Sequence, residues 1–118
     1  MKVVHARCMG EDGGDVERTI RRAIGGDPDA ISWIEAHAIT SAEPTIIAMA
    51  ALLARDPVLV AEALAVATTS RDRQLVVITG AYLRGDEQLV DALARDHLAD
   101  HPDSFMVAWI ASGAVGRA

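Results

Sequence analysis

The most hydrophobic region of the chain, residues 43–83, consists of three apolar segments separated by two short polar breaks. The breaks fall at residues 55–57 and 70–73. Within each segment hydrophobic residues occupy nearly every position, whereas an amphipathic surface helix carries them at intervals of three and four. We therefore expect each of the three segments to be covered by other parts of the chain on several sides.

The segments that flank this region are two-faced. In residues 15–24 the hydrophobic side chains recur at helical spacing, with charged side chains between them. The apolar stripe consists of Val16, Ile20, Ala23 and Ile24. Gly25 and Gly26 follow directly and end this predicted helix. Helices of this kind can cover the apolar segments.

Three aspartates mark the starts of later helices. Asp27 and Asp56 each precede a proline, and an aspartate N-cap followed by proline at the first helical position is a strong start signal. Asp86 follows a glycine, which is typical of a helix end. With further caps expected at Ser41 and Asp72, the predicted helices cover residues 28–40, 41–55, 57–69, 72–83, 87–99 and a last one from residue 102. No strand pattern follows residue 14, so the predicted class is all-α, with about seven short antiparallel helices.

The start signals recur at nearly constant spacing, which indicates an internal repeat. A shift of 29 residues places Asp27 on Asp56, and a further shift of 30 places Asp56 on Asp86. Repeats of this length are typically helix pairs that stack on their neighbours. The sequence therefore predicts about three stacked helical hairpins and a leading helix, an αα-superhelix whose amphipathic end helices cap the stack.

Residues 80–102 resemble the inner part of a tetratricopeptide-type repeat. The residues that carry the resemblance are Gly80 and Tyr82 in one helix, the Gly85–Asp86 turn, Ala92 and Leu98 in a second helix, and then Pro102. The family repeat is about 34 residues long, so the period of this chain is shorter, and Gly80 and Tyr82 stand closer together than in the family motif. The resemblance implies an αα-superhelix that binds peptides or partner helices.

Length and charge limit the possible functions. The chain has 118 residues, enough for one domain with its own core. Its formal net charge of −6 argues against nucleic-acid binding, which needs a basic surface. The apolar segments are about half as long as the roughly 20 residues that a membrane span requires. We therefore expect no nucleic-acid partner, no membrane insertion and a cytoplasmic location.

The ends of the chain differ from its helical part. We expect an arm over residues 1–14, a single helical-repeat domain over residues 15–112 and a tail over residues 113–118. Glycines separate the arm from the first helix, so it is expected to be poorly ordered unless it docks. The arm lacks the apolar stretch of a signal peptide, and its Cys8, the single cysteine, excludes an internal disulfide.

Two histidines near the end of the helix over residues 87–99 are candidate metal ligands. His97 and His101 stand four residues apart, a spacing that can place two imidazoles on one helix face. His5 and Cys8 in the arm could complete a four-ligand set. The alternative is a solvated helix end at which the helix dipole favours histidine, and Pro102 disfavours helical geometry at His101.

A second candidate site follows from the repeat, which places Trp33 and Glu62 at equivalent positions of successive hairpins. His37 lies one helical turn after Trp33 and shares its face. If this face is exposed, Trp33, His37 and Glu62 form a strip that could bind a small ligand. If it faces other helices, Trp33 is a core residue and His37 a hydrogen-bonded interior histidine.

Charged residues give two weaker hypotheses. An acidic partner could be received by five arginines, Arg18, Arg21 and Arg22 of the first helix and Arg71 and Arg73 of a loop. The alternative is a solvated face, on which the first helix pairs its own charges, Asp15 with Arg18 and Glu17 with Arg21. Glu35 and Glu62 lie among apolar residues, where a buried carboxylate would have a raised pKa and could act as a general base. A position at the rim of the core is the alternative for both.

The function most compatible with these patterns is a protein–protein interaction module built from helical hairpins. The large apolar surface of the central helices predicts a protein partner or a second copy, and thus homodimerisation. The alternative is a regulatory protein that binds a small ligand or metal through Trp33, His37 and Glu62 or through His97 and His101. No nucleophile motif or phosphate-binding loop stands out, so an enzyme is less favoured and no cofactor is predicted.

Overall fold

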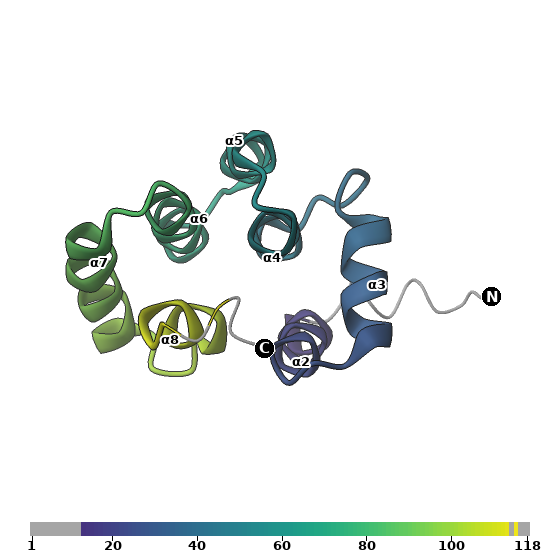
Figure 1. The fold of residues 1–118 in the computed structure, drawn as a ribbon, viewed down its shortest axis with the longest axis horizontal. Coiled ribbons are helices and arrows are strands. Elements are labelled where there is room, and N and C mark those ends of the chain that lie inside the picture. The colour runs from purple at the N-terminus through teal and green to yellow at the C-terminus, as the bar shows by residue number, and fades with distance from the viewer. Residues whose placement is uncertain (1–12, 114, 116–118) are drawn as a thin grey trace.

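The computed structural model describes residues 13–113 and residue 115, and this part of the chain contains seven α-helices and no strand (Figure 1). The helices are α2 (Gly13–Ile24), α3 (Pro28–His37), α4 (Pro44–Ala54), α5 (Pro57–Val66), α6 (Ser70–Leu83), α7 (Glu87–Asp100) and α8 (Phe105–Ala111). The predicted all-α class is confirmed. None of these helices is long and apolar enough to cross a bilayer. Most of the predicted arm and tail lies outside the described residues.

The three aspartates of the predicted start signals are the N-cap residues of α3, α5 and α7. Each side chain accepts a hydrogen bond from a backbone N–H in the first turn of its helix, at 2.9 Å for Asp27 and Asp56 and 3.2 Å for Asp86. Such a bond satisfies one of the N–H groups that a helix start leaves without a partner. The sequence therefore located these helix starts correctly.

The residue before each aspartate ends the preceding helix in the left-handed region. Its φ angle is 92° at Gly26, 54° at Arg55 and 76° at Gly85. The N–H of each following aspartate then reaches the carbonyl oxygen five residues earlier, at 3.0 Å in all three cases, as in a Schellman motif. The same backbone joint thus occurs three times, at intervals of 29 and 30 residues.

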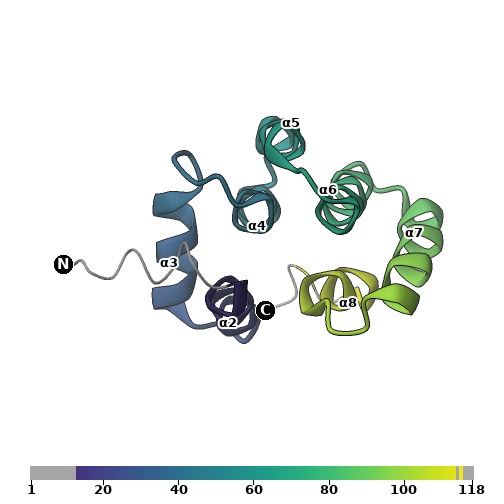
Figure 2. The ribbon, with the colours of Figure 1, turned by 180° about the vertical axis from the view of Figure 1, so that it is seen from behind.

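The helices form an inner group of α2, α4, α6 and α8 and an outer group of α3, α5 and α7 (Figures 1 and 2). Each outer helix packs on two inner ones: α3 on α2 and α4, α5 on α4 and α6, and α7 on α6 and α8. Neighbouring helices therefore pair in sequence order, as expected for stacked hairpins. The first and last helices of the described residues, α2 and α8, also contact each other, which closes the stack into a ring.

The core lies between the inner helices. Its largest fully buried side chains there are Ile20 of α2, Ile46 and Met49 of α4, Ile78 of α6, and Met106 and Ile110 of α8. The outer helices add Ile34 and His97 from their inward sides. α4 is the most deeply embedded helix, with nine of its eleven residues buried. For this helix the expected coverage on several sides is correct.

For α5 the same expectation was wrong. Of its ten residues only Ala63 is buried, whereas the side chains of Val58 and Leu64 are 62% and 44% exposed. The reason is its place in the ring, because α5 is an outer helix that packs only on α4 and α6 (Figure 1).

Several predicted helix ends were displaced by up to three residues. α4 begins at Pro44 rather than at Ser41, whose Oγ instead accepts a bond from the N–H of Glu43 at 2.9 Å. The N-cap of α6 is Thr69, whose hydroxyl accepts from the N–H of Asp72 at 3.1 Å. The N-cap residue of α4 is Glu43, which makes no side-chain cap bond, so only at α6 does another capping residue, Thr69, replace the expected one.

Candidate functional site

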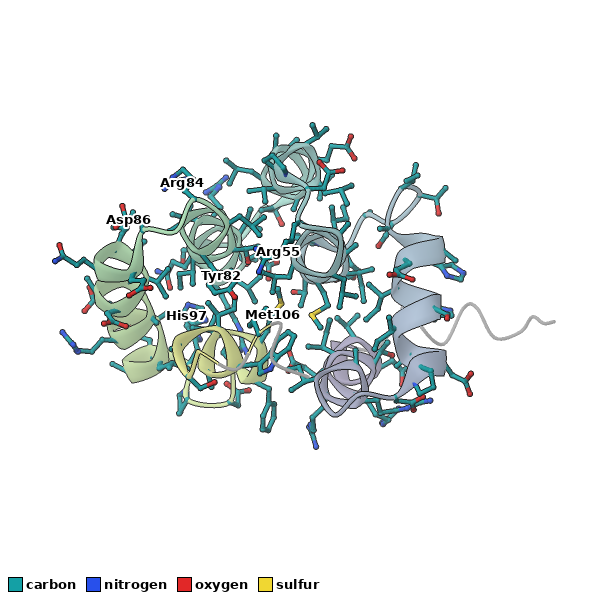
Figure 3. The ribbon with its side chains drawn as sticks, in the orientation of Figure 1. Arg55, Tyr82, Arg84, Asp86, His97 and Met106 are labelled. Atoms are coloured by element: carbon teal, nitrogen blue, oxygen red, sulfur yellow. The ribbon has the colours of Figure 1, made fainter. Side chains whose placement is uncertain are left out.

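His97 lies on α7 where this helix meets α6 and α8 (Figure 3), and its side chain is only 1% exposed. Its Nδ1 donates a hydrogen bond to Oε1 of Gln74 on α6 at 2.8 Å. Its Nε2 is hydrogen-bonded to the hydroxyl of Ser104, the N-cap residue of α8, at 3.1 Å, and the protonation of the ring decides which of the two groups donates. The ring therefore links three helices.

Burial is the main reason why the pKa of His97 is lowered, because the charged form loses its hydration in the core. The positive charges of His101 and Arg71 lower this pKa further. Asp100 and Asp103 act in the opposite direction but do not compensate. The surroundings of His97 thus favour the uncharged ring, in which Nε2 accepts from the Ser104 hydroxyl.

The predicted metal pair is adjacent in space, with the ring centroids of His97 and His101 4.9 Å apart and the rings tilted by 41°. However, both nitrogens of His97 are already hydrogen-bonded to protein groups. A metal ion would have to displace Gln74 or Ser104 from the ring. In residues 13–113 and 115 no group of three or more potential ligands is arranged to hold a metal, and His5 and Cys8 lie outside this range. The alternative of a solvated helix-end histidine does not describe the buried His97 either.

The second predicted site is brought together only in part. The rings of Trp33 and His37 are stacked, with centroids 4.2 Å apart and an interplanar angle of 17°. Nδ1 of His37 also donates to the carbonyl oxygen of Trp33 at 2.8 Å. Trp33 is half-buried and His37 exposed. Glu62 is exposed on α5, a different outer helix, and contacts neither ring through a hydrogen bond or ion pair in the described residues.

Most of the predicted arginine cluster is used within the chain. Arg18 pairs with Asp15 at 2.6 Å, Arg22 with Asp27 at 2.7 Å and Arg71 with Asp103 at 3.4 Å. The guanidinium of Arg21 lies over the ring of Phe105, 4.4 Å from its centroid, and so joins α2 to α8. These pairings favour the alternative in which the arginines are satisfied by the protein itself.

Glu17 of α2 lies within electrostatic reach of Arg21, Arg71 and Asp103. Partial burial raises the pKa of its carboxyl, an effect that Arg71 and Arg21 oppose and Asp103 reinforces. Glu35, by contrast, is exposed. The described carboxylates that were candidates for a general base, Glu35 and Glu62, therefore lie at the surface.

A cavity of about 550 Å³ opens where α4, α6 and α8 end and α7 begins. Residues that line it include Arg55, Tyr82, Asp86, Glu87, Asp91 and Ile110. The hydroxyl of Tyr82 donates to the carbonyl oxygen of Val115 across this end of the ring, at 3.2 Å. Figure 3 labels Arg55, Tyr82 and Asp86 around this end. This cavity was not predicted from the sequence. The one feature of the sequence that sets this end apart is Arg55, which occupies a joint position that is glycine at residues 26 and 85.

A smaller hollow of about 260 Å³ lies between α6 and α7 and is mainly apolar, with Val77 and Leu93 in its lining. Arg73 and Asp96 stand beside it, and His97 contributes to its wall. The buried ring of His97 is thus close to solvent on the side that faces this hollow.

The outward side of α5 is the largest departure from the expected burial. We name it the α5 outer face and define it by the exposed residues Pro57, Val58, Ala61, Glu62, Leu64 and Ala65. Glu62 is its single charged residue. Two of the five large hydrophobic side chains that are exposed in the described residues, Val58 and Leu64, lie on this face, and a contiguous exposed apolar patch is typical of a protein-binding site.

Comparisons of this chain with models of protein families, with curated proteins and with solved structures gave no match.

Proposed function

We propose that the protein is a protein–protein interaction module built from helical hairpins, and that the α5 outer face is its docking surface. The observation that carries this proposal is the exposure of a helix in which eight of ten residues are alanine, valine or leucine. Placing such a face against a partner would remove apolar area from water, which favours association by about 25 cal/mol for each Å². In an isolated chain the apolar side chains of this face stay in water and do not contribute to stability through burial.

The proposed repeat is tetratricopeptide-like, and the three recurring joints before Asp27, Asp56 and Asp86 support it. Superhelical repeat proteins usually bind partners in an open concave groove lined by their inner helices. Here the inner helices α2, α4, α6 and α8 pack on one another, and side chains such as Met49 and Ile78 fill the space between them. Docking is therefore proposed on the outer helix α5 rather than on the inner side.

The proposed partner is an amphipathic helix with one basic residue beside its apolar side. Charge complementarity supports this choice, because Glu62 would lose hydration in the interface and needs a cation opposite it. A second copy of this chain is the competing occupant. An antiparallel pair of α5 helices centred on the outer face would place the two Glu62 carboxylates near each other, and this repulsion disfavours the homodimer.

The probe is a labelled synthetic helix of leucine and alanine with lysine beside the apolar side, compared with a peptide carrying glutamate at that position. We expect the lysine peptide to bind more tightly in a fluorescence anisotropy titration. Glu62→Lys should reverse the preference between the two peptides. Leu64→Asp should weaken binding at least about tenfold, since placing a charge in a buried apolar contact costs more than 1.4 kcal/mol. Ile39→Asp, at a site 81% exposed in the turn after α3, is the matched control and should bind normally.

Three results would contradict the proposal. The first is no binding of either peptide to the wild-type protein, and the second is equal binding by wild type and Leu64→Asp. The third is a wild-type dimer in light scattering that Leu64→Asp converts to monomer, because the α5 outer face would then belong to a second copy. A monomer throughout agrees with the partner proposed here.

A small-ligand regulator is the second candidate, and the stacked Trp33–His37 pair favours it. A ligand held by this pair would change the fluorescence of Trp33. The variant Trp109→Phe leaves Trp33 as the single tryptophan of the chain and makes this signal unambiguous. No fluorescence response to a broad panel of metabolites and Zn²⁺ would count against this candidate, and Glu62→Gln tests whether the distant carboxylate participates.

A further inference from the structure

His97 is a titratable group for which the proposed docking function has no use. Of the three histidines in the described residues, His37, His97 and His101, only His97 is buried. It is also the one that bridges separate helices, since Gln74 belongs to α6 and Ser104 is the N-cap residue of α8. A hydrophobic side chain could fill this position without changing charge with pH.

A second proton on His97 would go to Nε2, the nitrogen that accepts from the Ser104 hydroxyl. The ring would then donate from both nitrogens, so the Ser104 hydroxyl would have to turn its hydrogen away. More importantly, a positive charge would lie in the core beside uncharged hydrogen-bond partners. Placing an isolated charge in such surroundings is far more costly than rearranging one hydrogen bond.

The charges around His97 come from every element that meets there. Arg71 of α6 and His101, which follows α7, disfavour a cation at His97, whereas Asp100 of α7 and Asp103 of the turn before α8 favour one. Asp103 is already paired with Arg71 at 3.4 Å, which reduces what it offers to His97. Arg73 and Asp96, which carry opposite charges, line the neighbouring hollow together with His97.

We propose that His97 is an acid-sensitive latch whose protonation releases α8 from α6 and α7 and so opens the ring between α8 and α2. α8 is the element that should yield, because it has seven residues and helices of this length are not stable without tertiary contacts. Its link to α2 includes the surface contact of Arg21 with the 42% exposed Phe105, whereas the buried contacts that opening must break are those of Met106, Val107 and Ile110, each at most 2% exposed.

The direction of the pH effect follows from the surroundings of His97. The pKa of His97 is lower in the closed ring than in a solvated histidine, whose pKa is about 6.5. Above about pH 6.5 neither state binds the proton and the latch is fully effective. As the pH falls from there towards the lowered pKa, the open state takes the proton first and closure loses stability, about tenfold in the opening constant for each pH unit. Glu17 has a raised pKa, so its titration stabilises the closed ring in acid and cannot cause this loss.

Hydrogen exchange on the full chain tests the proposal, with protection factors used so that the intrinsic pH dependence of exchange is removed. The informative amides are those of Ala108 and Ser112, which donate along α8. Between pH 7.5 and 5 we expect their protection to fall by up to about tenfold per unit below pH 6.5, while amides of α4 keep theirs. His97→Gln keeps a donor and an acceptor but cannot titrate, so its α8 protection should be independent of pH. His37→Gln is the matched control and should behave as wild type.

Two results would overturn the latch. One is α8 protection in the wild type that does not change between pH 7.5 and 5, and the other is an acid loss of the same size in His97→Gln. If His97→Gln does not fold, the imidazole resonances of the wild-type protein decide the question. A native-state pKa of His97 at or above 6.5 contradicts the proposal, and a lower one that coincides with the loss of α8 protection supports it.

Discussion

α4 and α5 are adjacent and similar in composition, but they differ in burial. Both begin with proline after an acidic residue, and they have eleven and ten residues. α4 carries no charged residue, and α5 only Glu62. Yet nine residues of α4 are buried and only one of α5. The pair forms the closest helix hairpin of the ring, so the contrast arises between two sides of one structural unit (Figure 1).

The contrast shows that hydrophobicity determines which residues can be buried. The position of their helix in the ring determines which of them are buried. α4 packs against α2, α3, α5 and α6, and thus has neighbours on all sides. α5 packs mainly against α4 and α6, and six of its ten residues are exposed. A helix that is apolar all round but covered on one side is expected to have a partner on the other.

The strongest test compares one substitution in the two helices. Leu52 of α4 is 3% exposed and Leu64 of α5 is 44% exposed. Leu52→Ala should lower the free energy of unfolding by about 3 kcal/mol, because it removes buried methyl groups and leaves a cavity. Leu64→Ala should lower it by about 0.5 kcal/mol or less, since most of its side chain already contacts water. Urea denaturation of both variants measures the difference.

Equal losses in the two variants would mean that Leu64 is buried in solution. Combined with a wild-type dimer, that result would place a second copy on the α5 outer face. A loss of less than 1 kcal/mol for Leu52→Ala would instead contradict the central place of α4 in the core, because leucine-to-alanine changes at fully buried sites cost about 2–5 kcal/mol.

The order of the seven helices could be read from the sequence because start and stop signals are local. An aspartate N-cap depends on the next two or three residues, and a left-handed joint on one φ angle, so Asp27, Asp56 and Asp86 were identified correctly. The contact of α2 with α8 was not predicted. This contact depends on how all the joints together curve the stack, and no short segment of the chain determines that total curvature.

The candidate sites show the same limit. The stacking of Trp33 on His37 could be anticipated because residues four apart share a helix face. The partners of His97 could not, because Gln74 is 23 residues away and lies on another helix. The equivalence of Trp33 and Glu62 was read as proximity, but residues at equivalent positions are neighbours only when their helices pack together. α3 and α5 lie on either side of α4 (Figure 1).

How firmly α5 is attached to α6 can be measured at Gly80, which is buried on α6. A Cβ atom added there would lie 3.3 Å from Cγ1 of Val60 on α5 and 3.5 Å from Nη1 of Arg84. Alanine is favoured over glycine within a helix by about 1 kcal/mol, but here the gain is opposed by the close contact with Val60. We expect Gly80→Ala to be nearly neutral in the wild type and stabilising by about 1 kcal/mol in the background Val60→Ala.

A double-mutant cycle in urea gives this coupling directly. A coupling near zero would show that α5 moves away from α6 without cost, and the hairpin would then be looser than its close contact indicates. A Gly80→Ala variant that is destabilised by several kcal/mol would show the reverse, an α5 held so rigidly that the contrast with α4 lies in solvent exposure alone.

The joint between α4 and α5 gives the smallest expected effect and isolates the backbone contribution. Arg55 has a φ angle of 54°, in the left-handed region where a residue with a Cβ atom is strained by about 1–2 kcal/mol. Glycine removes this strain but gives the unfolded chain more freedom, at a cost of about 0.5–1 kcal/mol. Arg55→Gly should therefore raise the free energy of unfolding by about 0.5 kcal/mol, and Gly85→Ala, at the equivalent joint with open space around its Cβ position, should lower it by a similar amount. If Arg55→Gly is destabilising instead, the Arg55 side chain stabilises the wall of the end cavity by more than the strain it causes, and the α4–α5 joint differs from its two equivalents in chemistry as well as in exposure.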